Sequence, residues 1–308
     1  MRSDWRGVFF VSATEFRPDE SVDLAATQRL VEGLIDDGAH GIVVLGRFGE
    51  VIALTADERR RVVAAVAEVV GGKVPLLAGA IETNADELAR YCRDMERLGI
   101  AGLMATPLLG YPPQRHEALR FARRLCSASA LPIMLYNEPT GFGVDYTPEM
   151  LASLADLDTL VAIKESTAQT RRVTELALEV GDRYRVFCGQ DDIILESLVL
   201  GADGWVCATG SAVAREAVYL FDCVQAGRLD EARAIYRWMY PLLHLDLRST
   251  FIQCGKLALE MCGRGSERVR FPLLPLQGEE RAEATGVVER LLATRPALPQ
   301  RSALRSAS

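Results

Sequence analysis

Lysine is scarce in this chain of 308 residues, which has only three although arginine is abundant. The net charge of -7 argues against nucleic-acid partners and against an anionic membrane surface, because both require clustered positive charge. The first apolar run, Val8 to Val11, is too short for the core of a signal peptide, and no later run approaches a membrane span. We therefore expect a cytoplasmic protein that acts on a small molecule.

Histidine and paired cysteines are also lacking. The three histidines, His40, His116 and His244, are far apart, so the imidazole cluster of most metal-dependent enzymes is absent. The seven cysteines are odd in number and include no Cys-x-x-Cys pair, which is typical of free thiols in a reducing compartment. A site made only of carboxylates would be needed to hold a metal, and nothing in the sequence indicates one.

Short apolar runs recur along the first two hundred residues, and each is brief and β-branched enough to be a buried parallel strand. Amphipathic segments separate them, with a capping box at Thr55 and Glu58 and an N-cap at Thr147 followed by proline. This pattern predicts a (β/α)8 barrel, and no Gly-x-Gly-x-x-Gly motif follows the first run to favour an open sheet. The eight predicted strands are Val8–Ala13, Gly41–Leu45, Pro75–Ala80, Gly102–Ala105, Pro132–Tyr136, Val161–Lys164, Arg185–Cys188 and Gly204–Cys207.

Helical patterns without intervening strands follow the eighth strand, near 212–226, 229–243, 251–262 and 279–292. The first closes the barrel, so we assign residues 1–226 to the barrel and residues 227–294 to a C-terminal helical region. Residues 295–308 combine scattered Pro, Ser and Arg, which indicates a disordered tail.

Lys164 stands out because it directly follows an apolar run, residues 160–163. An ammonium there is costly unless its pKa falls, and a lysine that is neutral near pH 7 is a nucleophile. The alternative is a lysine at a strand end that reaches solvent or pairs with Glu165. The other two lysines, Lys73 and Lys256, look ordinary.

Polar residues at strand ends are the candidates for an active site, because barrel enzymes build their sites from these ends and the loops that follow. Tyr136 ends the fifth strand and Lys164 ends the sixth, so a phenol and an amine are neighbours and form a plausible acid–base pair. After the second strand, two glycines bracket a turn whose N–H groups can bind an anion, although such a turn is often only a tight connection. The candidates at strand ends are Glu50, Thr106, Tyr136, Lys164, Asp191 and Thr209.

Three strings occur in order at these strand ends: Gly46 to Glu50, Tyr136 to Pro139, and Lys164 to Ser166. Together they resemble the motifs of the dihydrodipicolinate synthase and N-acetylneuraminate lyase family of Schiff-base aldolases, and the resemblance covers nearly the whole chain. It implies that Lys164 condenses with a 2-oxo acid such as pyruvate, while Tyr136 moves protons and the amides between Gly46 and Gly49 hold the substrate carboxylate. It also implies no metal or dissociable cofactor, and a homotetramer. Glu50 is expected to brace the loop.

The chain departs from the family pattern at several positions. Arg47 and Phe48 replace the Ser or Thr pair of better-known members, and we expect Arg47 to grip the substrate carboxylate, the alternative being that it points to solvent. Synthases of the lysine pathway carry a tyrosine where this chain has Leu108 and Leu109, and an arginine where it has Gly141. Both losses argue against dihydrodipicolinate synthesis, because a dicarboxylic partner would lose its cationic anchor.

The string Gly189 to Asp192, which follows the seventh strand, is similar to the segment with which sialate lyases bind the hydroxyls of their sugar chain. Ser166 matches a hydroxyl position in the same lyases. Carboxylates accept hydrogen bonds from hydroxyls, so a hydroxylated 2-oxo acid is predicted, unless one of the two aspartates caps a helix. Phe48, Phe142 and Leu109 make an aromatic or branched substrate an open alternative. The predicted binding residues of this group are Ser166, Gly189, Asp191 and Asp192.

Three functions remain open from the sequence. The leading one is a Schiff-base lyase, whether aldolase, dehydratase or deaminase. The second is 4-hydroxy-tetrahydrodipicolinate synthase proper. The third, of another class, is a barrel that binds 2-oxo acids without turnover.

Overall fold

Eight short runs of buried residues form the strands of the protein, and their bounds lie within two residues of the predicted ones. The computed structural model describes residues 3–105 and 111–299, so Thr106, Leu108 and Leu109 lie outside the described residues. The strands are β1 (Gly7–Val11), β2 (Gly41–Val44), β3 (Leu76–Ala80), β4 (Gly102–Ala105), β5 (Ile133–Asn137), β6 (Leu160–Glu165), β7 (Arg185–Cys188) and β8 (Gly204–Cys207).

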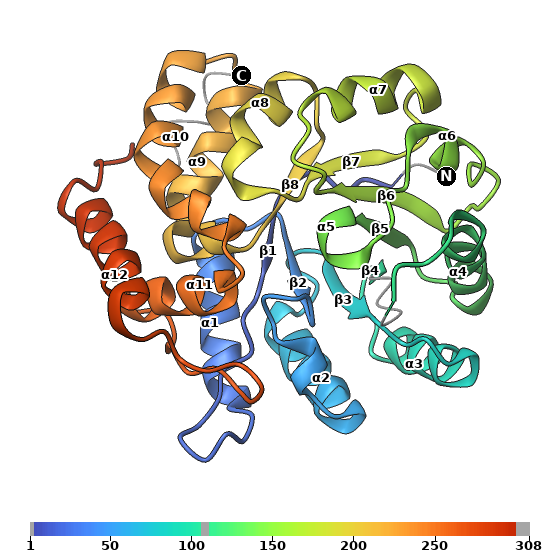
Figure 1. The fold of residues 1–308 in the computed structure, drawn as a ribbon, viewed down its shortest axis with the longest axis horizontal. Coiled ribbons are helices and arrows are strands. Elements are labelled where there is room, and N and C mark those ends of the chain that lie inside the picture. Colours follow the sequence, from blue (N-terminus) through green and yellow to red (C-terminus); the bar gives the residue numbers. More distant parts are fainter. Residues whose placement is uncertain (1–2, 106–110, 300–308) are drawn as a thin grey trace.

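All neighbouring strands pair in parallel in chain order, and β1 pairs with β8, so the sheet closes into a barrel (Figure 1). The predicted fold, a (β/α)8 barrel with additional C-terminal helices, is therefore confirmed. Each strand is followed by helical structure that covers the outside of the sheet, which explains why the strands are buried on both faces and lack a polar alternation. The helices before β8 are α1 (Leu24–Asp36), α2 (Ala56–Val70), α3 (Ala85–Arg97), α4 (Arg115–Ala128), α5 (Pro139–Phe142), α6 (Pro148–Ala152), α7 (Arg171–Val180) and α8 (Ile194–Val199).

Two predicted helix starts have the expected caps. The Thr55 hydroxyl accepts a hydrogen bond from the Glu58 N–H, and the Glu58 carboxylate accepts one from the Thr55 N–H, which completes a capping box at α2. The Thr147 hydroxyl accepts from Met150 at α6, where Pro148 occupies the first helical position. Local side-chain chemistry thus sets where these helices begin.

Aromatic side chains fill the end of the barrel away from the strands' carboxyl ends. The rings of Phe9 and Phe187 meet edge to face with centroids 5.1 Å apart. Glycines make room for them, since a Cβ at Gly41 would lie 2.6 Å from the Phe9 ring and one at Gly204 would lie 2.4 Å from the Phe187 ring. These rings fill part of the barrel interior, and the candidate polar residues lie at the carboxyl ends of the strands.

After β8 the chain runs through α9 (Ala214–Gln225), α10 (Leu229–Leu243), α11 (Phe251–Met261) and α12 (Gly278–Ala293), as predicted from the helical patterns. In Figure 1 α10 and α12 lie on one side of the barrel, and α11 lies between α12 and the strands. Arg295, which begins the predicted tail, donates two hydrogen bonds to Glu216 of α9. Residues 300–308 of the tail lie outside the described residues.

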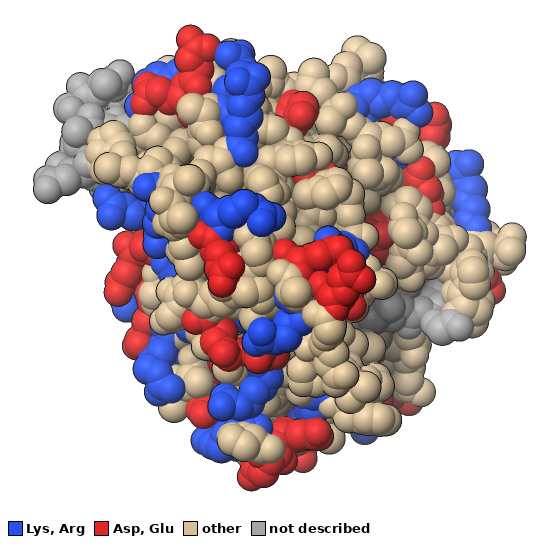
Figure 2. All heavy atoms as spheres, turned by 60° about the vertical axis from the view of Figure 1, so that its left-hand side comes forward, with Lys and Arg blue, Asp and Glu red and all other residues tan. Residues whose placement is uncertain are grey.

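Within residues 3–105 and 111–299, no helix has the length and apolar character that crossing a membrane requires. Figure 2 shows a face on which Lys and Arg side chains are interspersed with Asp and Glu side chains.

Candidate active site

A cavity of about 390 Å³ opens at the carboxyl ends of the strands. It lies where the sequence places the candidate residues, since the loops after β2, β5, β6, β7 and β8 contribute to its wall. The 3-10 helix η4 (His244–Leu247) and the start of α11 contribute as well. The residues that line the cavity are Val11, Gly46, Arg47, Phe48, Met104, Tyr136, Glu138, Thr140, Gly141, Lys164, Ser166, Ala168, Gly189, Gln190, Ala208, Asp246, Leu247, Arg248, Ser249 and Phe251.

Lys164 lies inside this cavity and its side chain meets Tyr136, as predicted. The two residues are direct partners in the β5–β6 register, and the Lys164 Nζ lies 3.8 Å from the centre of the Tyr136 ring. Lys164 is only 5 % exposed, and within the described residues its Nζ forms no ion pair with Glu165 or any other carboxylate. Tyr136 in turn packs edge to face on Phe142. The amine is therefore held against an aromatic face, a favourable position for a cation.

Gly189 gives Lys164 the space it occupies. A Cβ at position 189 would lie 2.6 Å from both Cγ and Cε of Lys164 and 2.1 Å from the Ser166 Oγ. The Ser166 hydroxyl is buried at the cavity wall, and no hydrogen-bond partner for it exists among the described residues. A buried hydroxyl without a partner is costly, so this one is available to a bound molecule. The structure thus brings Lys164, Ser166 and Gly189 together.

The loop from Gly46 to Gly49 forms a tight turn between two residues in left-handed conformation, Leu45 with φ 59° and Glu50 with φ 52°. Such a conformation is strained for residues with a side chain, and strain of this kind concentrates at functional sites. Within the described residues, the N–H groups of Arg47 and Phe48 meet no acceptor, while the Gly49 N–H bonds the Gly46 carbonyl. The turn therefore presents two N–H groups beside the cavity, an arrangement that suits an anion.

Glu50 braces this loop through an ion pair with Lys256, a lysine for which the sequence predicted no special role. Lys256 of α11 has no exposed surface, and its Nζ lies 2.8 Å from the Glu50 carboxylate and 2.9 Å from the Thr14 carbonyl oxygen. The other Glu50 oxygen accepts a hydrogen bond from the Arg270 N–H. Burial raises the pKa of Glu50, and the charge of Lys256 opposes that rise. The prediction that Lys256 is ordinary was wrong, because its neighbours come from distant parts of the chain.

Arg47 is paired with another side chain of the cavity wall. Its guanidinium reaches across the cavity mouth to Glu138, with 2.8 Å between Nη1 and Oε2. The ring of Phe251 lies 5.1 Å from the guanidinium carbon on one side and that of Phe142 lies 6.0 Å away on another. Arg47 therefore does not simply point to solvent, and its expected contact with the substrate carboxylate stays a prediction.

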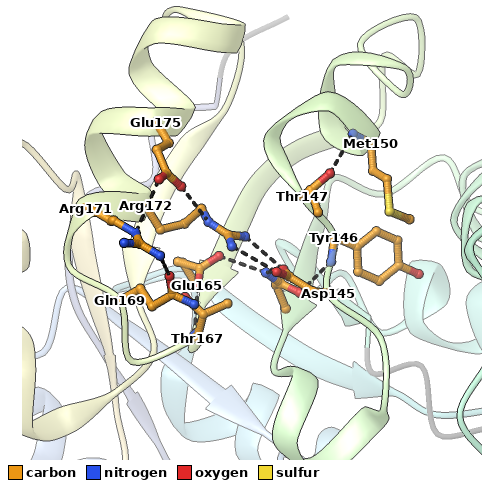
Figure 3. A network of polar contacts seen from close by, with 11 residues as sticks. Asp145, Tyr146, Thr147, Met150, Glu165, Thr167, Gln169, Arg171, Arg172 and Glu175 are labelled. Carbon is orange, nitrogen blue, oxygen red and sulfur yellow. Dashed lines mark hydrogen bonds and ion pairs between the residues drawn. The ribbon is translucent and has the colours of Figure 1, made fainter.

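A network behind the cavity fixes the residues that follow Tyr136 and Lys164 (Figure 3). The Asn137 amide donates to both Glu165 and Asp145, at 2.9 and 3.0 Å. Arg172 of α7 binds Asp145 with two parallel hydrogen bonds of 2.8 and 2.9 Å. These bonds hold the pKa of Asp145 below its usual value, whereas burial raises the pKa of Glu165. Because β5 and β6 are tied together in this way, Tyr136 and Lys164 keep their relative position.

The two aspartates after β7 do not line the cavity. Asp191 is fully buried and accepts hydrogen bonds from Trp205 Nε1, the Thr209 hydroxyl and backbone N–H groups of residues 208–210. Asp192 lies 3.0 Å from His244 Nδ1. Asp191 therefore organises the turn after β8, where Thr209 is itself one of the predicted residues at strand ends, instead of capping the helix that follows it.

The comparison with known proteins agrees with this geometry. Residues 4–291 match the Dihydrodipicolinate synthetase family. The chain belongs to this family. It is 32 % identical to the 4-hydroxy-tetrahydrodipicolinate synthase of Pelobacter propionicus over 289 residues, which cover 92 % of this chain and 98 % of that protein. A synthase of the same name from Synechococcus sp. is 33 % identical over 284 residues, or 92 % of this chain and 93 % of its own.

Solved structures of the family have the same fold. YagE of Escherichia coli K12, described in complex with pyruvate, superposes with a TM-score of 0.88 at 26 % identity, covering 94 % of this chain and 98 % of YagE. The synthase of Methylacidiphilum fumariolicum gives 0.88 at 25 % identity and covers 99 % of both chains. These results confirm the broad class of activity predicted above, a Schiff-base-forming lyase that acts on a 2-oxo acid.

Two carboxylates of the cavity wall in this dihydrodipicolinate synthetase family member were missed. Glu138 stands within the Tyr-Asn-x-Pro run, so its position one residue beyond a strand end was a signal in the sequence. Asp246 comes from η4, in the region that we treated as an appendage, and no local signal marked it. Burial raises the pKa of both, and the neighbouring Asp191 carboxylate raises that of Asp246 further. Among the described residues no group of three His, Cys, Asp or Glu side chains is placed to hold a metal ion.

Proposed function

We propose that the protein cleaves a 2-oxo acid through a Schiff base on Lys164, in a retro-aldol reaction. The observation that carries this proposal is the position of the Lys164 amine, which lies in the cavity against the Tyr136 ring and forms no ion pair with a carboxylate of the described residues. An amine that is not engaged with a carboxylate can attack a carbonyl carbon as soon as it loses its proton.

The neighbouring groups supply the other needs of the reaction. The N–H groups of Arg47 and Phe48 hold the carboxylate of the 2-oxo acid beside Lys164. The amine adds to the carbonyl of a 4-hydroxy-2-oxo acid, water leaves, and the resulting iminium takes up the electron pair when the bond between carbons 3 and 4 breaks. The 4-hydroxyl loses its proton in this step, so carbon 4 leaves as an aldehyde, and protonation and hydrolysis of the remaining enamine release the shorter 2-oxo acid and free Lys164. Tyr136 moves the protons of these steps, and the Ser166 hydroxyl bonds a polar group of the substrate. Dehydration and deamination share the iminium and differ in the group that leaves.

A second candidate is 4-hydroxy-tetrahydrodipicolinate synthase, because relatives 30–33 % identical carry that name. Against it stands Gly141, where synthases have an arginine for the second carboxylate. An assay with pyruvate and aspartate semialdehyde separates the two candidates: formation of the cyclic product would favour the synthase.

The test of the proposed function is mass spectrometry after borohydride reduction in the presence of a panel of 2-oxo acids, beginning with pyruvate. We expect a reduced adduct on Lys164 in the wild type and none in Lys164→Ala. Product analysis of the acids that form adducts then identifies the bond that breaks. If folded wild-type protein forms no adduct with any 2-oxo acid, the lyase proposal is wrong.

We also infer a cytoplasmic homo-oligomer, and a tetramer by analogy with the family. The family and exposed apolar side chains such as Tyr111, which is 58 % exposed, support this inference. Leu108 and Leu109, which precede Tyr111 in the chain, lie outside the described residues. Native mass spectrometry of Tyr111→Ala tests the assembly, and an oligomer of unchanged mass and stability would count against this contact.

A further inference from the structure

The ion pair between Arg47 and Glu138 spans two loops of the cavity wall that are 91 residues apart in the chain. One Glu138 oxygen accepts from Arg47 at 2.8 Å, and the other accepts from the Gly141 N–H at 2.9 Å. The Glu138 carboxylate is therefore bonded at both oxygens, while the Arg47 guanidinium carbon lies 6.0 Å from the centre of the Phe142 ring and 5.1 Å from that of Phe251.

Gly141 is the third part of this unit. A Cβ at position 141 would lie 2.1 Å from Glu138 Oε2 and 3.0 Å from Arg47 Nη1. The ion pair thus occupies the space that any side chain at position 141 would need. Arg47, Glu138 and Gly141 are mutually dependent, and the three together set the charge of this part of the wall.

The charge balance of the wall disfavours a second carboxylate on the substrate. Arg47 is neutralised by Glu138, and Arg248, the other arginine of the wall, pairs with Glu283 at 3.0 Å. Asp246 adds a further carboxyl group to the lining. Because Glu138 lies 2.8 Å from Arg47, a substrate carboxylate that approached Arg47 would also meet the charge of Glu138, and like charges at short distances repel. A hydroxyl, in contrast, can donate a hydrogen bond to either carboxylate.

We propose that Glu138 is a specificity-determining residue that selects 2-oxo acids with an uncharged, hydroxylated distal end and rejects those with a second carboxylate. It does so by neutralising Arg47 and by accepting a hydrogen bond from a substrate hydroxyl. This proposal rests on the proposed function, since it assigns the substrate class of the same site.

The experiment compares three probes in the borohydride trapping assay: pyruvate, 4-hydroxy-2-oxopentanoate and 4-hydroxy-2-oxoglutarate. The last two share the hydroxyl and differ in the distal carboxylate. In the wild type we expect the rate of adduct formation to favour the monocarboxylate by at least tenfold. In Glu138→Gln, which keeps the size but removes the charge, Arg47 becomes an unpaired cation, and we expect the ratio to shift toward the dicarboxylate by about tenfold or more.

The matched control is the double variant Arg47→Gln/Glu138→Gln, in which the freed guanidinium is absent and the gain for the dicarboxylate must disappear. Gly141→Ala displaces the pair by steric contact alone, and the proposal predicts a smaller shift in the same direction. A wild type that forms the pyruvate adduct but accepts both hydroxy acids equally, or a ratio unchanged in Glu138→Gln, overturns this inference and leaves the proposed function intact. Absence of any adduct, pyruvate included, overturns both.

Discussion

Replacing Lys256 by methionine tests how the turn from Gly46 to Gly49 is held in place. The Lys256–Glu50 pair is completely buried, and Lys256 also donates a hydrogen bond to the Thr14 carbonyl. Methionine fills a similar volume but leaves Glu50 as a buried charge with one backbone donor, from Arg270. Removing one partner of a buried ion pair costs about 3–5 kcal/mol. We expect this loss in the free energy of unfolding of Lys256→Met at pH 7.5.

The pH dependence of the loss identifies its cause. Burial already raises the pKa of Glu50 in the folded protein, and removing Lys256 raises it further. A carboxyl whose pKa is higher in the folded than in the unfolded state favours folding at low pH, and this stability is lost as the pH rises through the folded-state pKa. The loss in the free energy of unfolding of Lys256→Met should therefore be largest near pH 8 and should shrink toward pH 5. A change of 3 kcal/mol corresponds to about two pKa units.

Urea unfolding followed by tryptophan fluorescence measures the deficit, with Trp205 in the barrel core as a buried probe. The control is Glu50→Gln/Lys256→Met, in which both charges are absent and we expect about 2 kcal/mol to be regained. The reasoning is refuted if the single variant loses less than about 1 kcal/mol at pH 7.5, or if single and double variants are equally destabilised at every pH.

Further predictions concern the groups around the nucleophile. Tyr136→Phe should lower kcat by about 10² to 10⁴ while a slow adduct still forms on Lys164, as single-turnover trapping would reveal. Gly189→Ala should lower the rate of adduct formation by about 10², because its Cβ displaces Lys164; an unaltered rate would refute the packing argument. Arg172→Met should reduce stability more at neutral pH than at low pH, since the lowered pKa of Asp145 contributes stability that is complete above its ordinary value of 3.8 and is lost as the pH falls through the folded-state pKa; a deficit that does not shrink at all in acid would contradict this.

Much of the architecture could be predicted because its signals are local. Eight apolar runs, the capping box at Thr55 and the proline after Thr147 depend on neighbours within a few residues, and all were found at or near the predicted positions. The meeting of Tyr136 and Lys164 also followed from the sequence, since residues at the ends of adjacent parallel strands must lie side by side.

The partners of the charged side chains could not be predicted in the same way. Lys256 meets Glu50 across 206 residues of chain, and Arg47 meets Glu138 across 91. Asp191 was expected to face a substrate, but it turns toward Thr209 and the backbone after β8, where several donors surround it. Nothing near Asp191 in the sequence indicates those donors.

The sequence by itself thus determined the order and number of strands and helices, and it placed Lys164, the proposed nucleophile, beside Tyr136. These features depend on hydrophobic periodicity, capping and strand register, each of which acts over a few residues or between adjacent elements. Only the tertiary structure decided which buried charges pair, and with them the roles of Glu50, Glu138 and Lys256. The physical reason is that a buried charge must find a partner wherever packing supplies one, and packing joins segments that are distant in the chain.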